Sequence, residues 1–124
     1  MSQKKILLVE DNEFNRKIVH DLLARHPYDL MEAHDGEAGV EAARREKPDL
    51  IIMDVQLPRL SGLDATRRIR AEPETAKIPI IVVTSFALSG DDKKAMDAGA
   101  SAYLAKPYSP RQLLDAIRKM LGDA

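Results

Sequence analysis

Carboxylates, a hydroxyl group and a lysine follow four short apolar runs of the sequence, each at the point where the run ends. The runs cover residues 6–9, 50–53, 80–83 and 102–105, and they are followed by Glu10-Asp11, Asp54, Thr84-Ser85 and Lys106-Pro107. Apolar runs without alternation are typical of strands that are buried on both faces of a parallel sheet. Because ligands bind beyond the carboxyl ends of such strands, we expect these polar residues to meet in one pocket.

The charge of this pocket favours a divalent cation. Glu10, Asp11 and Asp54 contribute three negative charges and Lys106 one positive charge, which leaves a net charge of about −2 in a small space. Two like charges about 4 Å apart repel by roughly 4 kcal/mol at an effective dielectric constant of about 20. Oxygen ligands that retain some water favour Mg²⁺. With a phosphoryl group between the metal ion and the lysine, an attacking carboxylate would complete the set for phosphoryl transfer.

The segments between the apolar runs have the pattern of amphipathic helices. One face of the last helix carries Leu113, Leu114, Ile117, Met120 and Leu121, and the first helix has a similar stripe of Ile18, Val19, Leu22 and Leu23. A fifth run, residues 29–33, is less apolar and is expected nearer a sheet edge. Strand and helix then alternate five times, which predicts an α/β fold with a five-stranded, doubly wound parallel sheet over about residues 3–122.

Local signals fix some of the ends and faces of these elements. Ser109-Pro110 predicts the start of the last helix, and Gly99 the end of the helix before it. Four of the five methionines, at positions 31, 53, 96 and 120, are expected in the core. The arginines at positions 44, 45, 67, 68 and 70 are expected on solvated helix faces.

Length and composition limit the class of protein. A chain of 124 residues with 44% hydrophobic residues is enough for one folded domain. Its 19 basic and 20 acidic residues argue against a nucleic-acid binder. The absence of cysteine excludes disulfides and thiolate chemistry and fits a reducing cytoplasm. Because the apolar run at 78–83 is far shorter than the roughly 20 residues of a membrane helix, we expect a cytoplasmic protein without a membrane partner.

The sequence resembles the receiver domain of two-component response regulators over nearly its whole length. The motifs that carry the resemblance are Leu8-Val9-Glu10-Asp11-Asn12, residues 48–54, Leu57-Pro58 with Ser61-Gly62, Val83-Thr84-Ser85, and Lys106-Pro107. The resemblance implies the flavodoxin-like (βα)5 fold with three layers. It also implies a phosphoacceptor signalling protein, which catalyses only its own phosphorylation and slow dephosphorylation, and not a metabolic enzyme.

In this family the residue at the position of Asp54 accepts a phosphoryl group from a partner's phosphohistidine. The resemblance therefore implies that Asp54 is the phosphorylation site and that the partner is a histidine kinase or a histidine phosphotransfer protein. Glu10 and Asp11 match the acidic pair that binds Mg²⁺ in the family. Asp54 and the backbone carbonyl of Gln56 match the other protein ligands of the metal ion.

Four further positions match the residues that hold the phosphoryl group and respond to it. Thr84 matches the hydroxyl group that turns toward the phosphoryl group, and Lys106 matches the lysine that pairs with it. Tyr103 matches the aromatic residue that switches together with the hydroxyl. The Lys106–Pro107 peptide bond is cis in the family, a state that requires tertiary support.

Finer motifs resemble particular kinds of receiver. The pattern of Glu10-Asp11-Asn12 with Asn15 is similar to receivers of hybrid kinases and to certain stand-alone regulators, and segments 54–58, 84–87 and 90–92 are similar to single-domain cell-cycle regulators. The resemblance thus implies one receiver domain over residues 1–124 with no output domain. Its signal would leave by binding a protein target through about residues 88–98 and 101–118. The alternatives are a receiver that relays phosphate onward and a receiver excised from a hybrid histidine kinase.

Three other functions are compatible with parts of the pattern. A phosphohydrolase of the haloacid dehalogenase kind needs Asp-x-Asp after the first strand, where this chain has Glu10-Asp11-Asn12. A nucleotide or flavin binder needs a phosphate loop rich in glycine, serine or threonine at that point, and an acidic loop would repel phosphate. A pseudo-receiver that folds but is not phosphorylated would lack a pocket residue, and none is missing from the sequence.

Overall fold

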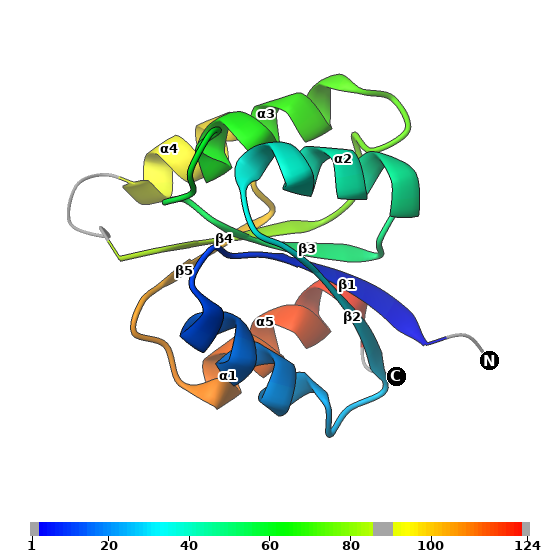
Figure 1. The fold of residues 1–124 in the computed structure, drawn as a ribbon, viewed down its shortest axis with the longest axis vertical. Helices are drawn as coiled ribbons and strands as arrows, with labels where there is room; N and C mark the ends of the chain where they lie inside the picture. The colour runs from blue at the N-terminus through cyan, green and yellow to red at the C-terminus, as the bar shows by residue number, and fades with distance from the viewer. Residues whose placement is uncertain (1–2, 86–90, 123–124) are drawn as a thin grey trace.

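Strands and helices alternate along the chain, as Figure 1 shows. A computed structural model describes residues 3–85 and 91–122 of the protein. In these residues the strands are β1 (Lys4–Val9), β2 (Tyr28–Ala33), β3 (Leu50–Asp54), β4 (Ile80–Thr84) and β5 (Ala102–Ala105). The helices are α1 (Glu13–Leu23), α2 (Gly36–Glu46), α3 (Gly62–Ala71), α4 (Asp91–Ala98) and α5 (Pro110–Leu121). No helix of the described residues is long and apolar enough to cross a membrane.

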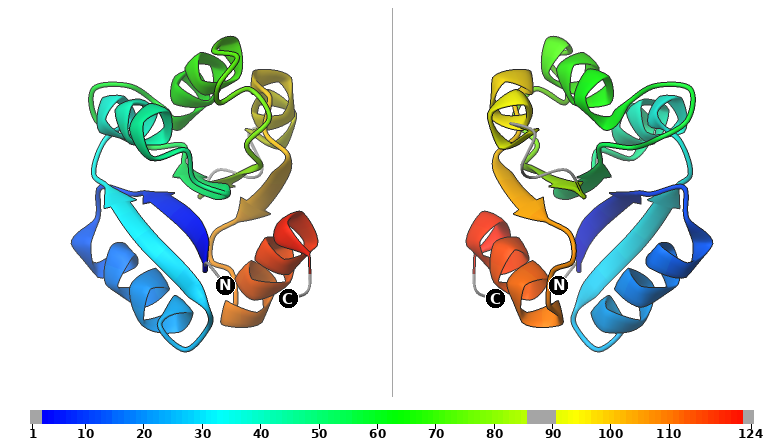
Figure 2. Two further views of the ribbon diagram at one scale, coloured as in Figure 1. Left: turned by 90° about the vertical axis from the view of Figure 1, so that its right-hand side faces the viewer. Right: turned by 90° about the vertical axis from the view of Figure 1, so that its left-hand side faces the viewer.

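The strands form one parallel sheet in the order β2-β1-β3-β4-β5. Helices α1 and α5 cover one face, and α2, α3 and α4 cover the other, which gives three layers (Figure 2). The predicted doubly wound α/β fold is confirmed, and β2 lies at an edge as predicted, with β5 at the opposite edge. Because Asp54 pairs with Val83 and Thr84 with Ala105, the carboxyl ends of the central strands meet at one end of the sheet.

The sheet has a hydrophobic core on each face because successive strand residues point to opposite sides. Residues that face α2, α3 and α4 include Leu7, Val9, Ile51, Met53, Ile80 and Val82. Residues that face α1 and α5 include Ile6, Leu8, Leu50, Ile52, Ile81 and Val83. Both sets are buried, which explains why the strands read as continuous apolar runs rather than as alternating patterns.

Four helices begin at a capping side chain. Asn12, Asp35, Ser61 and Ser109 each accept a hydrogen bond from the backbone N–H three residues further on. Ser109 and Gln112 form a reciprocal capping box at the predicted start of α5. Gly99 has a φ of +110° directly after α4, so the predicted glycine stop is confirmed. Each cap contributes about 1 kcal/mol to helix stability.

Two apolar residues are exposed, one from the predicted apolar stripe of the first helix and one predicted in the core. Ile18 is 47% exposed, because α1 turns Val19 and Leu23 toward the sheet and leaves Ile18 at the margin. Met96 is 51% exposed, whereas Met53 is buried and Met31 and Met120 are partly buried. On α4 the small residues Ala95 and Ala98 face the core, and a helical residue next to Ala95 lies about 100° around the axis.

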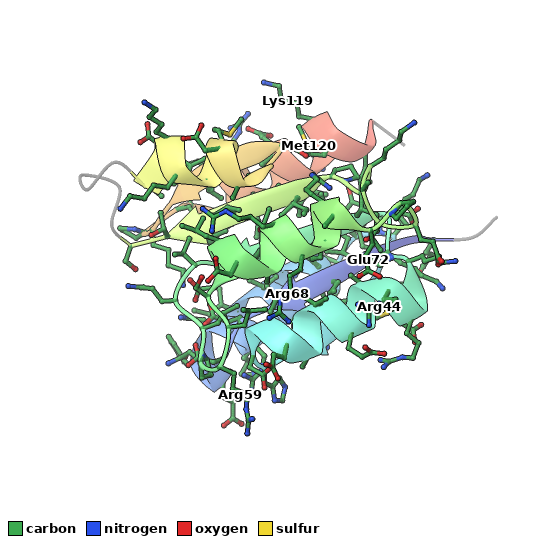
Figure 3. All side chains as sticks on the ribbon, turned by 90° about the horizontal axis from the view of Figure 1, so that it is seen from above. Arg44, Arg59, Arg68, Glu72, Lys119 and Met120 are labelled. Carbon is green, nitrogen blue, oxygen red and sulfur yellow. The ribbon has the colours of Figure 1, made fainter. Side chains whose placement is uncertain are left out.

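The arginines differ in the way they are solvated. Arg44 on α2 points toward Glu72 at the end of α3, with an Nη2–Oε2 distance of 2.7 Å, and both lie on the surface (Figure 3). The expectation of a solvated face was wrong for Arg70, which is half-buried. Its guanidinium donates to the carbonyl oxygens of Ile78 (2.6 Å) and Gly99 (2.8 Å), because both loops end beneath α3. Arg70 therefore ties α3 to the loops before β4 and after α4.

Helix α2 approaches the sheet closely at Gly39. A Cβ atom added at Gly39 would lie 2.9 Å from both methyl carbons of Val9, so the contact cannot be relieved by rotating the valine. We expect Gly39→Ala to lower the free energy of unfolding by about 1 kcal/mol, since overpacking costs about 1–3 kcal/mol and outweighs the gain of about 1 kcal/mol in helix propensity. Urea unfolding measures the difference.

The control is the same substitution in a Val9→Ala background, where the two methyl groups are absent. There Gly39→Ala should be neutral or stabilising, and the double-mutant cycle should give a coupling of about 1 kcal/mol or more. A stabilising effect of Gly39→Ala with Val9 present would contradict the contact.

Candidate functional site

Lys106 joins two carboxylates that are far apart in the sequence. Its Nζ atom lies 3.1 Å from Oε1 of Glu10 and 3.2 Å from Oδ2 of Asp54. Glu10 follows β1, Asp54 ends β3 and Lys106 follows β5, so three parallel strands deliver these side chains to one end of the sheet. The structure thus brings together three of the residues that the sequence predicted in a single pocket.

Asp54 is held from two sides. It is the last residue of β3, the central strand, and it is only 5% exposed. Its Oδ1 atom accepts a hydrogen bond from the backbone N–H of Gln56 (3.2 Å), and its Oδ2 atom accepts one from Lys106. Gln56 itself is exposed, two residues beyond the strand. A carboxylate fixed in this way is ready to act as a nucleophile without first changing its position.

The acidic residues form a compact set of oxygen ligands. Carboxylate oxygens of Glu10, Asp11 and Asp54 all lie within 4.8 Å of one another. Glu10 is 5% exposed and accepts a hydrogen bond from the backbone N–H of Asn12 (3.1 Å), whereas Asp11 is exposed. Hard divalent cations prefer such carboxylate oxygens, so the donor set fits Mg²⁺.

The carboxylates of the pocket lie close together although their charges repel one another. Burial raises the pKa of Glu10 above its ordinary value, and the nearby charge of Asp54 raises it further. Burial tends to lower the pKa of Lys106, but the carboxylates of Asp54 and Glu10 outweigh this effect and leave it raised. Lys106 is therefore protonated at neutral pH and offsets only part of the negative charge, which favours binding of a further cation.

Thr84 and the loop that carries Glu10 and Asp11, called the acidic loop here, lie on opposite sides of Asp54, because β4 and β1 flank β3. Thr84 is the last residue of β4 and is fully buried. Its carbonyl oxygen accepts a hydrogen bond from the backbone N–H of Lys106 (2.8 Å), so the ends of β4 and β5 are joined directly behind the lysine. The Lys106–Pro107 peptide bond is cis.

Tyr103 lies on β5 beside this pair of residues. It is paired in register with Val82 of β4, and its partly buried side chain packs against the core on the α2, α3 and α4 side. The structure therefore places Tyr103 between the strand that ends in Thr84 and the surface near α4. Of the segments with finer motifs, residues 86–90, which include Phe86, Ala87 and Gly90, lie outside the described residues.

Two glycines allow the loop after Asp54 to pack tightly. A Cβ atom at Gly62 would overlap the carbonyl oxygen of Asp54, and one at Gly36 would overlap the carbonyl oxygen of Leu60. The loop between β3 and α3 is thus clamped by the first residue of α3 and the first residue of α2. Gly62 was predicted as a turn former within a motif, and Gly36 was not predicted, because a close approach between backbones leaves no periodic signal.

An apolar hollow opens beside Lys106. Its volume is about 390 Å³, and its lining includes Ile18, Pro107 and Tyr108. Burial raises the pKa of Tyr108, so its phenol stays neutral at physiological pH. Ile18 and Tyr108 were not predicted as neighbours of the pocket, because Ile18 belongs to the apolar stripe of the first helix and Tyr108 follows the last motif. The exposed isoleucine shows that the pocket has an apolar margin on the α1 side.

Comparisons with known proteins agree with this geometry. The family model for the response regulator receiver domain matches residues 6–118. The chain is 40% identical over 121 residues to the polar-differentiation response regulators DivK of Brucella anthropi and Brucella abortus, with 98% of each chain covered.

Solved structures give the same result. The receiver domain of the sensor histidine kinase PA1611 from Pseudomonas aeruginosa, which has a magnesium ion coordinated in its active-site cleft, is 38% identical with a TM-score of 0.91 and covers 98% of this chain and 99% of its own. The chemotaxis response regulator CheY4 of Vibrio cholerae is 26% identical with a TM-score of 0.89 and covers 95% of this chain and 98% of its own.

The raised pKa of Glu10 predicts a pH-dependent cost in stability. The folded protein holds a proton on Glu10 at higher pH than the unfolded chain, so the contribution of Glu10 to the free energy of unfolding falls as the pH rises from 4.5 through the raised pKa. In EDTA at neutral pH we expect Glu10→Gln to be more stable than the wild type, because glutamine removes the charge that burial and Asp54 oppose. The gain should vanish toward pH 4.5.

Urea unfolding over a pH series in EDTA measures this gain. Asp115→Asn, which removes an exposed carboxylate of α5, is the control and should show no such pH-dependent gain. A Glu10→Gln variant that is less stable than the wild type throughout this range would contradict the electrostatic account.

Proposed function

The chain belongs to the response regulator receiver domain family, and we propose that it accepts a phosphoryl group on Asp54 in a Mg²⁺-dependent reaction. The donor is the phosphohistidine of a histidine kinase or of a histidine phosphotransfer protein. The observation that carries this proposal is the Asp54 carboxylate, which is buried at the end of the central strand between Lys106 and two further carboxylates. The magnesium ion in the PA1611 receiver supports the choice of metal.

Glu10, Asp11, Asp54 and the backbone of Gln56 are the residues that would hold Mg²⁺. Bound there, the ion would neutralise the acidic cluster and the negative charge of the phosphoryl group. This matters because a phosphoryl group carries negative charge and would otherwise be repelled by a pocket with a net charge of about −2. The metal requirement of the reaction therefore follows from the charge of the site.

The transfer itself is assigned to three side chains. A carboxylate oxygen of Asp54 attacks the phosphorus atom, the P–N bond to the donor histidine breaks, and its electron pair returns to the imidazole. The ammonium group of Lys106, 3.2 Å from Asp54, balances charge on the phosphoryl oxygens. The hydroxyl group of Thr84 binds the same oxygens once the acyl phosphate has formed.

We further propose that the phosphorylated receiver signals by binding a protein. The DivK relatives are matched over 98% of their own length, which supports signalling through the surface of the receiver domain itself and a role in cell-cycle or cell-fate control. The proposed binding surface, called the output face here, consists of α4, β5 and α5. It lies beside Thr84 and Lys106, it contains the edge strand with Tyr103, and it presents the exposed side chain of Met96.

Onward relay of the phosphoryl group is a second candidate function. The observation that favours it is the 38% identity to the receiver domain of a sensor histidine kinase. A phosphorylated sample mixed with a histidine phosphotransfer protein distinguishes the two. Relay predicts transfer of the label to the phosphotransfer protein, and terminal signalling predicts release of the label only as inorganic phosphate.

The acceptor assignment predicts a single site of phosphorylation. Acetyl phosphate with Mg²⁺ should add about 80 Da to the wild type, the mass of one phosphoryl group, and nothing to Asp54→Asn, because Asp54 ends the central strand and its carboxylate is fixed by both the Gln56 N–H and Lys106. EDTA should prevent labelling of the wild type, and Asp11→Asn should require much more Mg²⁺. Intact-mass spectrometry measures these outcomes, with Asp115→Asn as a control that is labelled normally. Labelled Asp54→Asn protein would refute the assignment.

The switch assignment predicts that chemistry and signalling can be separated. Thr84→Ala should still be phosphorylated, because the nucleophile and metal ligands remain, but beryllofluoride should no longer shift the amide resonances of residues 91–98 and 101–118. The wild type should show these shifts on the output face and few on α2. Tyr103→Ala should weaken phosphorylation-dependent partner binding, whereas Arg45→Ala on α2 should not. Shifts confined to α2 would place the signalling surface elsewhere.

A further inference from the structure

Arg16 of α1 lies beneath the acidic loop and contacts its backbone rather than its carboxylates. Its Nη1 atom donates hydrogen bonds to the carbonyl oxygens of Glu10 (3.0 Å) and Asp11 (2.8 Å). Its Nε atom lies 3.5 Å from Oε1 of Glu32 on β2, and the side chain is only 13% exposed. One guanidinium therefore binds the backbone of two of the three residues that supply carboxylates to the site, and a carboxylate on the neighbouring strand holds it in place.

The same loop is fixed by local hydrogen bonds on its other side. The N–H of Asn12 donates to Oε2 of Glu10, and the Asn12 side chain caps α1 by accepting from the N–H of Asn15. The N–H of Arg16 donates to the carbonyl oxygen of Asn12 in the first turn of the helix. The acidic loop caps the start of α1, and Arg16 of the same helix binds the carbonyl groups of the loop.

This restraint acts against a repulsive force. The carboxylates of Glu10, Asp11 and Asp54 are close together, and like charges at this separation repel. A loop free to move would relieve the repulsion by turning its carboxylates apart, and a cation would then have to pull them together again. A loop whose peptide groups are fixed keeps the carboxylates in place before the cation arrives.

We propose that Arg16 is a positioning residue for the divalent cation: by binding both carbonyl groups of the acidic loop, it keeps Glu10 and Asp11 oriented for Mg²⁺. The inference rests on the proposed function, since it concerns the same metal site. Arg16 is not itself a metal ligand, and it contacts the acidic loop through the backbone carbonyl groups. Partners of this kind, one step removed from a metal ion, typically change metal affinity by about 10–100-fold when they are removed.

The direction in which the Mg²⁺ affinity changes when Arg16 is replaced distinguishes a positioning role from an effect of its charge alone. Arg16 is a cation near a cation-binding site, so its charge alone repels Mg²⁺, and removing it should tighten binding. Positioning predicts the opposite result. Arg16→Lys keeps the charge but replaces the planar group that reaches two carbonyl oxygens, so it should also weaken binding. Both variants are therefore informative, and the lysine variant is the milder one for folding.

The experiment is a Mg²⁺ titration of the full chain by isothermal titration calorimetry, with urea unfolding in EDTA for every variant. Arg16→Gln should raise the Kd for Mg²⁺ by about tenfold or more, and Arg16→Lys by several-fold. Lys17→Gln is the charge control, because it removes the same charge from the next, exposed residue of α1. Arg70→Gln is the stability control, because Arg70 also donates to backbone carbonyls but at the other end of β4.

Both controls should keep the Kd within about twofold of the wild type, even where Arg70→Gln lowers the free energy of unfolding as much as Arg16→Gln does. An unchanged or lower Kd in Arg16→Gln would overturn the inference, as would an equal rise in Arg70→Gln. If Arg16→Gln does not fold, a Kd for Arg16→Lys within twofold of the wild type would overturn it. A wild type that binds no Mg²⁺ would overturn the proposed function, and this inference with it.

Discussion

The constraint on which the rest of the structure depends is the confinement of three carboxylates at the end of one parallel sheet. Glu10 and Asp54 share a single ammonium group, that of Lys106, and the exposed carboxylate of Asp11 lies close to both. The raised pKa of Glu10 is the direct sign of this confinement, since burial and the charge of Asp54 both act against ionisation. An arrangement of this kind persists only where the surrounding structure holds it.

The fold supplies that support through two cores and tight loops. Both faces of the sheet are covered, so the inner strands β3 and β4, which end in the site, are buried along their length. Gly36 and Gly62 let two helices close on the loop after Asp54, and Arg16 holds the loop after β1. The carboxylates of the site therefore repel one another, and the packing of the surrounding fold holds them in place. Such an arrangement is common where a protein needs a fixed charge distribution for binding or chemistry.

Much of this could be predicted from the sequence, because it depends on patterns with a short period. Unbroken apolar runs indicated buried parallel strands, and the rule that ligands bind at their carboxyl ends predicted that Asp54 and Lys106 lie together. The burial of Met96 was predicted wrongly, because a helix with a weak stripe does not reveal which face packs. Arg16 and Arg70 were also beyond prediction, because their partners are backbone carbonyls whose positions follow from the tertiary fold alone.

The two sides of the site differ in how firmly they are held, and this difference favours one route for a signal. On the β1 side, Arg16 and the capped start of α1 restrain the acidic loop. On the other side, the backbone N–H of Lys106 donates to the carbonyl oxygen of Thr84, and β5 is an edge strand that is only partly buried. A change of charge at Asp54 acts on both sides through the same short distances. Because segments with fewer buried contacts rearrange at a lower cost in free energy, the response should appear at β5 and its neighbours, and the acidic loop should stay in place.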